Sequence, residues 1–169
     1  MAIRNVREDG DEVLRKKSRT IEVVDEKIKE LAQDLLDTMY KYNGVGLAAP
    51  QVGLLKRIVV IDIEDGHGPY VLINPEIIKE KGEQEVDEGC LSFPNKFAKV
   101  IRPAELTVKF TNLDGKTEQL KAKDFLAQAI SHEVDHLEGI LFVDKMIPGT
   151  LEVITPEPED GKNKNKKKK

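Results

Sequence analysis

The feature that most constrains this 169-residue chain is the pattern His-Glu-x-x-His at residues 132–136. Residues four apart on a helix lie one turn above each other, so His132 and His136 can direct two imidazoles at one metal ion. Glu133 would border the same space. A buried helix with two inward histidines must also satisfy their polar atoms, which a metal would do. The pattern therefore predicts a hydrolytic metal site, with a solvated helix carrying two surface histidines as the alternative.

The flanking residues predict where this helix begins and ends. An apolar set at helical spacing precedes the motif, which indicates a buried face. We expect Asp124 to be the N-cap and Gly139 to follow the last turn.

The third ligand of such a site is not evident from spacing. A catalytic zinc-type site has three protein ligands and an open position. Six residues after the second histidine, where an extended form of the motif has a third histidine, the chain has Phe142. His67 lies in a Gly- and Pro-containing turn and is expected on the surface. Cys90 is the other candidate, and a small buried apolar side chain is its alternative role.

The pattern of apolar residues predicts an α+β fold with mainly antiparallel β-sheets packed around the central motif-bearing helix. Apolar residues every three or four positions predict an amphipathic helix near the N-terminus, capped by Asp25. Between the two helices we expect breaks at residues 74–75 and 93–95. Strands are expected at residues 57–63, 70–73, 77–78, 83–86, 98–101, 105–111 and 117–122, and the N-terminal helix at residues 25–42.

Composition indicates one globular domain, residues 1–150, and a flexible lysine-rich tail, residues 151–169. No apolar run approaches the length of a membrane span, and one free cysteine fits a reducing cytoplasm. The formal net charge is −4, but six of the 27 basic residues lie in residues 161–169, which contain no acid. Residues 1–160 therefore carry 21 basic and 31 acidic side chains, a charge unlike that of a DNA-binding protein.

Residues 44–53 form a small, glycine-rich and nearly uncharged stretch, Gly-Val-Gly-Leu-Ala-Ala-Pro-Gln-Val-Gly. It lacks the Gly-Lys-Ser/Thr ending of a phosphate-binding loop. We expect an irregular segment whose glycines let the backbone approach a ligand closely.

Three motifs occur together in this order: residues 44–51 of that stretch, Glu-Gly-Cys-Leu-Ser at residues 88–92, and His-Glu-Val-Asp-His at residues 132–136. With them the chain resembles the peptide deformylase family over roughly residues 3–148. The resemblance implies removal of the formyl group from the N-terminal formylmethionine of nascent bacterial proteins in the cytoplasm. It implies Fe2+ as the native metal, with Ni2+, Co2+ or Zn2+ able to substitute. It also implies that Cys90, His132 and His136 bind that metal.

The resemblance further implies roles for individual residues. The side-chain amide of Gln51 and the backbone N–H of Leu91 would stabilise the developing oxyanion, and Glu133 would act as general base and then acid. Glu88 and Arg102 would steady the cysteine loop, whereas Asp135 has no role assigned. The substrate would be held by Val45, Gly46, Val86, Gly89, Leu126 and Ala129, with ordinary core packing as the alternative for Val86, Leu126 and Ala129.

Two other functions compete with this interpretation. A His-Glu-x-x-His metallopeptidase would cleave internal bonds, and a non-catalytic metal-binding domain would use the metal for structure, usually with four protein ligands. Partners other than formylated peptides are expected to be few, with no membrane and no specific DNA. The lysine tail is a candidate for weak, salt-dependent ribosome binding, and a solubilising end without a partner is its alternative.

Overall fold

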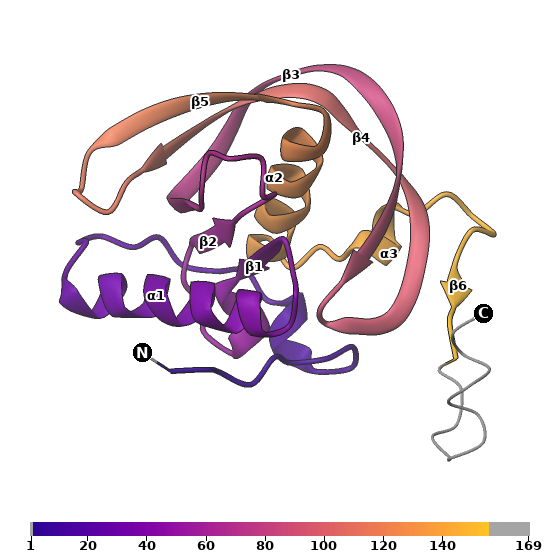
Figure 1. The fold of residues 1–169 in the computed structure, drawn as a ribbon, viewed down its shortest axis with the longest axis horizontal. Coiled ribbons are helices and arrows are strands. Elements are labelled where there is room, and N and C mark those ends of the chain that lie inside the picture. Colours follow the sequence, from indigo (N-terminus) through magenta and orange to yellow (C-terminus); the bar gives the residue numbers. More distant parts are fainter. Residues whose placement is uncertain (1, 156–169) are drawn as a thin grey trace.

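Helix α2 (Asp124–Leu137) lies at the centre of the fold, inside a strongly curved antiparallel sheet (Figure 1). The computed structural model describes residues 2–155. The sheet has the strand order β1-β2-β3-β4-β5, and the short strand β6 pairs with β4. The α+β class predicted from the sequence is confirmed. The strands are β1 (Gly46–Ala48), β2 (Ile58–Ile61), β3 (Tyr70–Cys90), β4 (Phe93–Thr111), β5 (Thr117–Lys123) and β6 (Glu152–Val153).

Helix α1 (Glu26–Lys41) forms an outer layer along one side of the sheet (Figure 1). It begins where the Asp25 side chain accepts a hydrogen bond from the backbone N–H of Ile28 at 3.0 Å, as predicted. Its apolar face packs on residues of β1, β2 and β3. The remaining short helices are η1 (Glu12–Arg15), η2 (Ala49–Val52) and α3 (Phe142–Lys145).

Strands β3 and β4 form one long hairpin that curls around α2 (Figure 1). The breaks predicted at residues 74–75 and 93–95 are wrong, because the backbone continues as strand through both. The prolines are accommodated by changes in register, which occur between Ile73 and Glu76 and between Glu88 and Cys90. Asn74 takes a positive φ of 53°, and its side chain bonds the backbone of Ile21 at 2.8 and 2.7 Å.

Two local predictions near the motifs also need correction. Asp124 does not cap α2: it is the first helical residue, with φ of 55°, while Lys123 occupies the N-cap without a side-chain hydrogen bond. Gly139 follows the helix with φ of 75°, as predicted. The stretch 44–53 is more regular than expected, since it contains β1 and η2.

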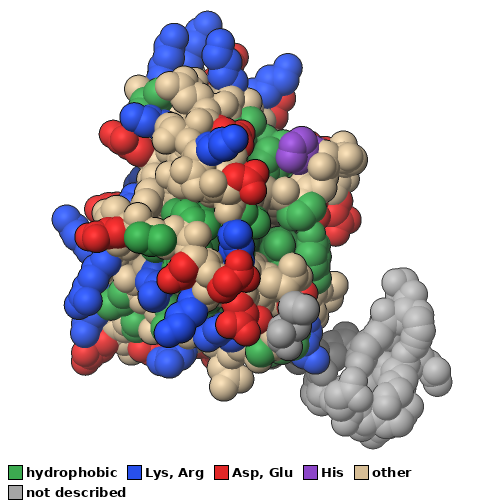
Figure 2. Space-filling view, turned by 90° about the vertical axis from the view of Figure 1, so that its left-hand side faces the viewer, with side chains coloured by type: hydrophobic (Ala, Val, Ile, Leu, Met, Phe, Trp, Pro, Cys, Tyr) green, Lys and Arg blue, Asp and Glu red, His purple; other side chains and the backbone are tan. Residues whose placement is uncertain are grey.

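Three groups of buried apolar side chains form the core. One lies under α1, one between α2 and the sheet, and one where α3 meets the tip of the β3–β4 hairpin. On the face drawn in Figure 2, positive and negative side chains are interspersed, with small apolar patches between them. Among residues 2–155, no helix is long and apolar enough to cross a membrane. The lysine run at residues 162–169 lies outside the described residues.

Candidate active site

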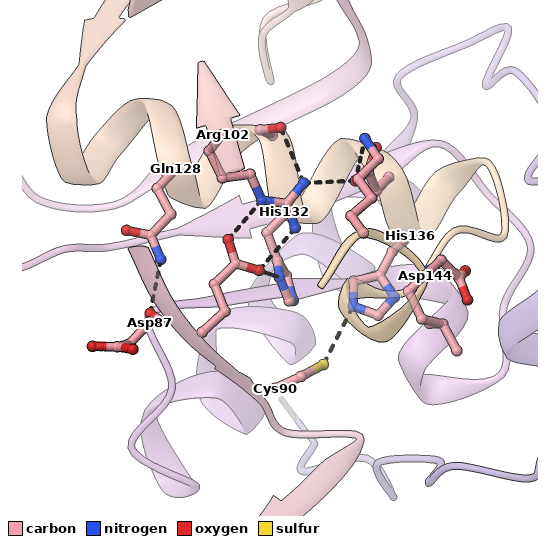
Figure 3. Close-up of polar contacts among 12 residues, drawn as sticks. Asp87, Cys90, Arg102, Gln128, His132, His136 and Asp144 are labelled. Carbon is pink, nitrogen blue, oxygen red and sulfur yellow. Dashed lines mark hydrogen bonds and ion pairs between the residues drawn. The ribbon is translucent and has the colours of Figure 1, made fainter. Parts of the chain in front are cut away.

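Cys90, His132 and His136 meet in the interior of the molecule (Figure 3). Their donor atoms all lie within 4.8 Å of one another, and the Cys90 sulfur is 3.4 Å from Nε2 of His136. Both histidines are buried on α2, whereas Cys90 ends β3. One thiolate and two imidazoles converging in this way form a donor set that suits Zn2+, Fe2+, Co2+ or Ni2+. The three residues therefore fit a divalent metal with an open coordination position.

A chain of buried charges fixes the orientation of His132. Nδ1 of His132 lies 2.8 Å from Oε1 of Glu88, which directs Nε2 toward Cys90. Glu88 in turn receives two hydrogen bonds from the Arg102 guanidinium, at 2.6 and 2.8 Å. Arg102 also donates to Asp135 at 2.7 Å, and Asp135 pairs with Lys145 of α3 at 2.9 Å. Asp135, to which the sequence assigned no role, thus links Arg102 to Lys145 and lies on the same helix as the histidines.

The ionisation of these groups follows from their burial and their neighbours. Burial opposes charge on Glu88, but hydrogen bonds from Arg102 and His132 outweigh it and lower its pKa to about 2. Burial alone would lower the pKa of His132, yet contacts with Cys90 and Glu88 raise it well above the ordinary value. Burial and the neighbouring His132 lower the pKa of His136. Glu88 is therefore a buried carboxylate that can hold His132 through Nδ1, which leaves Nε2 of His132 available to a metal.

Glu133 differs from the other carboxylates of the site because one of its oxygens has no partner. Its Oε1 is buried without a hydrogen-bond partner among residues 2–155. Burial raises the pKa of Glu133 to about 7. Its other oxygen reaches the backbone of β1: a Cβ on Gly46 would lie 2.5 Å from Oε2. Only glycine lets β1 pass this close to the carboxylate.

The amide of Gln51 is oriented by its own loop. Its Oε1 accepts from the backbone N–H of Ala48 at 3.0 Å, so its NH2 group faces the cysteine loop. There Nε2 lies 3.1 Å from Oγ of Ser92 and 3.5 Å from the Cys90 sulfur. Leu91 follows Cys90, and its side chain packs against Gly44. Gln51 and Leu91, predicted to act together, thus come from two loops in contact.

A cavity of about 690 Å³ opens beside these residues. Of the predicted substrate residues, Val45, Gly46, Gly89 and Ala129 line it. Val86 packs in the apolar group beside α3, and Leu126 packs in the group between α2 and the sheet, and neither lines the cavity. His67 is exposed and stacks on Tyr70, in the predicted turn.

Sequence reasoning missed part of the cavity wall. The N-terminal segment contributes Asn5, Val6 and Glu8, although no motif marks it. Exposed aromatic residues form the rim: Tyr42, Phe97 and Phe125, with exposed fractions of 43%, 40% and 45%. The sequence signal that could have pointed to these three residues is that each is a large aromatic side chain at or next to the end of a predicted strand or helix. The N-terminal segment is brought there only by tertiary contacts, such as the bond from Arg7 N–H to the carbonyl of Gln51 at 2.6 Å.

A converging Cys-His-His set, with an unpartnered carboxylate and an oriented amide beside a cavity, defines a candidate metal-dependent hydrolase. The family described as polypeptide deformylase matches residues 3–151. A peptide deformylase of Acetivibrio thermocellus is 51% identical, over 98% of this chain and 96% of that protein. Peptide deformylase 1 of Clostridium perfringens is 52% identical, over 85% of this chain and 98% of that protein. The chain belongs to the polypeptide deformylase family.

Solved structures agree with this assignment. The crystal structure of peptide deformylase from Thermotoga maritima superposes with a TM-score of 0.84. It is 39% identical in sequence and covers 88% of this chain and 100% of that chain. A peptide deformylase from Legionella pneumophila gives a TM-score of 0.84 at 44% identity, over 87% of this chain and 88% of that one. The fold and the enzyme class are therefore those of a peptide deformylase.

Proposed function

We propose that this chain removes the formyl group from N-formylmethionyl nascent peptides, with a metal ion held by Cys90, His132 and His136. The convergence of these three donor atoms in the family's fold is the observation that carries the proposal. A metal bound there would supply Lewis acidity and lower the pKa of a water molecule. We further propose the cytoplasm as its compartment, since nascent chains are made there.

Glu133 is the proton carrier in this proposal. Its buried Oε1 has no partner among the described residues, so it can accept a proton from the attacking water. The same carboxyl group can then deliver the proton to the departing amine. Formate and a free N-terminal amine are the products.

The oxyanion that develops on the formyl group needs hydrogen-bond donors. The Gln51 amide is held with its NH2 group toward the cysteine loop, and the N–H of Leu91 lies on that loop. Preorganised donors of this kind cost no reorganisation during the reaction. Cys90 acts in this scheme as a ligand and not as a nucleophile.

The peptide part of the substrate has a matching edge of backbone. Strand β1 pairs with β2 on one side, and its other side is an edge of the sheet. An extended peptide can add to such an edge, which would place its methionine side chain in the cavity lined by Val45 and Ala129. Formate release from formyl-Met-Ala-Ser tests the proposal. The expected result is turnover of this peptide without cleavage of its internal bonds, whereas internal cleavage would support the rival metallopeptidase.

We propose Fe2+ as the native metal, with Ni2+, Co2+ or Zn2+ as substitutes. Thiolate and imidazole ligands suit all four ions. Iron beside a thiolate is open to oxidation, so enzyme prepared without oxygen should lose activity in air and recover it with Ni2+. Metal analysis of protein purified without oxygen identifies the bound ion. The rates at which the iron and nickel forms lose activity in air then test the predicted sensitivity to oxidation. Equal lifetimes in air would argue against iron.

A further inference from the structure

The hairpin that carries Cys90 is held in two different ways along its length. Its inner part, Cys90 to Phe93, is buried or nearly so: Ser92 is fully buried, and Phe93 is 3% exposed. Ser92 accepts a hydrogen bond from the backbone N–H of Asp9 at 2.8 Å and another from Gln51 at 3.1 Å. The inner part is thus fixed from the N-terminal segment and the Gln51 loop.

The outer part of the hairpin, residues 94–97, receives no hydrogen bond from the Gln51 loop, and its link to the N-terminal segment is a partly exposed ion pair between Lys96 and Asp9 at 3.6 Å. Pro94, Asn95 and Phe97 are exposed, yet all three line the cavity. Asn95 holds a positive φ of 64°, a left-handed conformation that asparagine adopts more readily than most residues. The ring of Phe97 lies against Gly89, where an added Cβ would be 2.6 Å from Cε1 of the ring. The position of Phe97 therefore sets the width of the cavity next to the residue that precedes Cys90.

Residues 146–154 run along the free edge of this outer part (Figure 1). The N–H of Ile154 donates to the carbonyl of Asn95 at 2.7 Å, and Glu152 pairs with Phe97 in the register of β6. The hydroxyl of Thr150 accepts from the N–H of Lys99 at 3.1 Å and donates to the carbonyl of Ile147 at 2.6 Å. Few apolar contacts accompany these bonds, since Leu151, Val153 and Ile154 are 41%, 61% and 53% exposed.

We propose that segment 150–154 positions the outer part of the hairpin, and that it thereby sets the affinity of the active site for the peptide rather than the rate of the chemical step. The inference rests on the proposed function, because the cavity rim matters only if a peptide occupies it. The metal ligands and Gln51 keep their own supports, so loosening the outer part leaves them in place. Without this support, residues 95–97 would sample several conformations. The peptide would then bind only the fraction of enzyme molecules in which the cavity rim keeps its shape, so its apparent affinity would fall.

Two matched pairs of variants in the full-length chain test this. Ile154→Pro removes the backbone donor to Asn95, whereas Ile154→Ala removes only the side chain. Thr150→Val removes both hydrogen bonds of the hydroxyl, whereas Thr150→Ser retains them. The double variant Ile154→Pro/Thr150→Val is compared with the double control Ile154→Ala/Thr150→Ser.

We expect the KM for formyl-Met-Ala-Ser to rise by on the order of tenfold in the double variant relative to its control, since several hydrogen bonds are lost together. The kcat and the metal content should stay within about twofold. Hydrogen exchange at the amides of residues 95–97 should accelerate, while exchange at Leu91 and Ser92 should not.

Equal KM values in the two double variants would overturn the proposal. A parallel loss of kcat and metal would also overturn it, because the segment would then support the whole site. Failure of the proposed function is separate: the parent enzyme would release no formate, while hydrogen exchange would still report whether the segment holds the hairpin.

Discussion

The two long helices of the fold are stabilised in contrasting ways. Helix α1 is amphipathic, begins at a side-chain cap and buries one mostly apolar face. Helix α2 has no side-chain cap. Its buried residues include five with polar side chains: Gln128, Ser131, His132, Glu133 and His136. Buried polar groups cost free energy unless they are paired. Helix α2 therefore depends on partners from other elements, and its polar burial serves the site at the expense of stability.

The largest difference between the helices is expected on replacing Glu133. Glu133→Ala should lower kcat/KM by about 10²–10⁴-fold, the usual range for a general acid–base group. The metal should be retained, since Glu133 is not one of the three converging donors. Formate release and metal analysis measure the two effects.

Two other variants serve as controls for this prediction. Cys90→Ala should lose the metal as well as the activity, and Glu138→Ala, one residue beyond α2, should keep both. Turnover by Glu133→Ala at close to the parental rate would contradict the proposed proton carrier.

A smaller but still large effect is expected at Arg102, which is 1% exposed and joins Glu88 to Asp135. Arg102→Met leaves the buried Glu88 and the partly buried Asp135 without their main partner, and breaking a buried ion pair typically costs about 3–5 kcal/mol of the free energy of unfolding. Metal affinity should fall by about 10–100-fold, because His132 loses the support that orients it through Glu88. Denaturant unfolding and a competitive metal-binding titration check these values.

Arg57→Met is the matched control for Arg102. Arg57 also pairs with a carboxylate, that of Glu138 at 2.6 Å, but it is not linked to His132. The Arg57→Met variant should have a lower free energy of unfolding than the parent but the same affinity for the metal. If both variants lost metal equally, the chain from Asp135 to His132 would have no special role.

On α1 the expected effect is on stability alone. Asp25→Ala removes the cap on Ile28 and should lower the free energy of unfolding by about 1 kcal/mol. The kcat/KM should not change, because α1 contributes none of the residues that line the cavity. Glu30→Ala, on the exposed face of α1, should stay within about 0.5 kcal/mol of the parent. A loss of activity in Asp25→Ala at full folding would show that the helices are coupled.

The smallest effect is expected at the Tyr40 hydroxyl near the end of α1. It donates to the Asp62 carboxylate at 2.5 Å, and burial together with this bond raises the pKa of Tyr40 to about 12. A raised pKa means that the neutral form is favoured by folding. The stabilisation is therefore complete below about pH 10, the unfolded pKa, and is lost as pH rises toward about 12.

Comparison with Tyr40→Phe isolates this contribution. The difference in the free energy of unfolding between parent and variant should be small at pH 9 and should shrink toward zero as pH approaches 12. A constant difference across this range would mean that the tyrosine does not titrate as described.

Helix α1 was predictable from the sequence because its determinants are local. A cap three residues from its partner and an apolar period of 3.6 lie within one segment. The same holds for Gly139 after α2, whose φ of 75° is as predicted. Asp124 was misjudged because the chain enters α2 directly from β5, so that Asp124 takes a positive φ instead of a capping conformation.

The breaks expected at residues 74–75 and 93–95 failed for a related reason. Proline normally interrupts a strand, but a register shift accommodates it when long partner strands are already paired. Strand β3 pairs with β4 along most of its length, so the paired backbone overrides the local preference for a turn. No signal within residues 74–75 or 93–95 carries that information.

The sequence by itself determined the type of chemistry: two histidines four apart on a helix with a glutamate between them, and a family resemblance that added Cys90. Tertiary structure alone decided how those atoms meet. The Cys90 sulfur is 46 residues from His136 and yet 3.4 Å from its Nε2, because the β3–β4 hairpin curls around α2. Likewise Asp135, Arg102 and Glu88 join into one chain of charges only after β3, β4 and α2 pack together. Helical spacing is a local property that can be read from the sequence, whereas the approach of distant segments depends on burying the whole core.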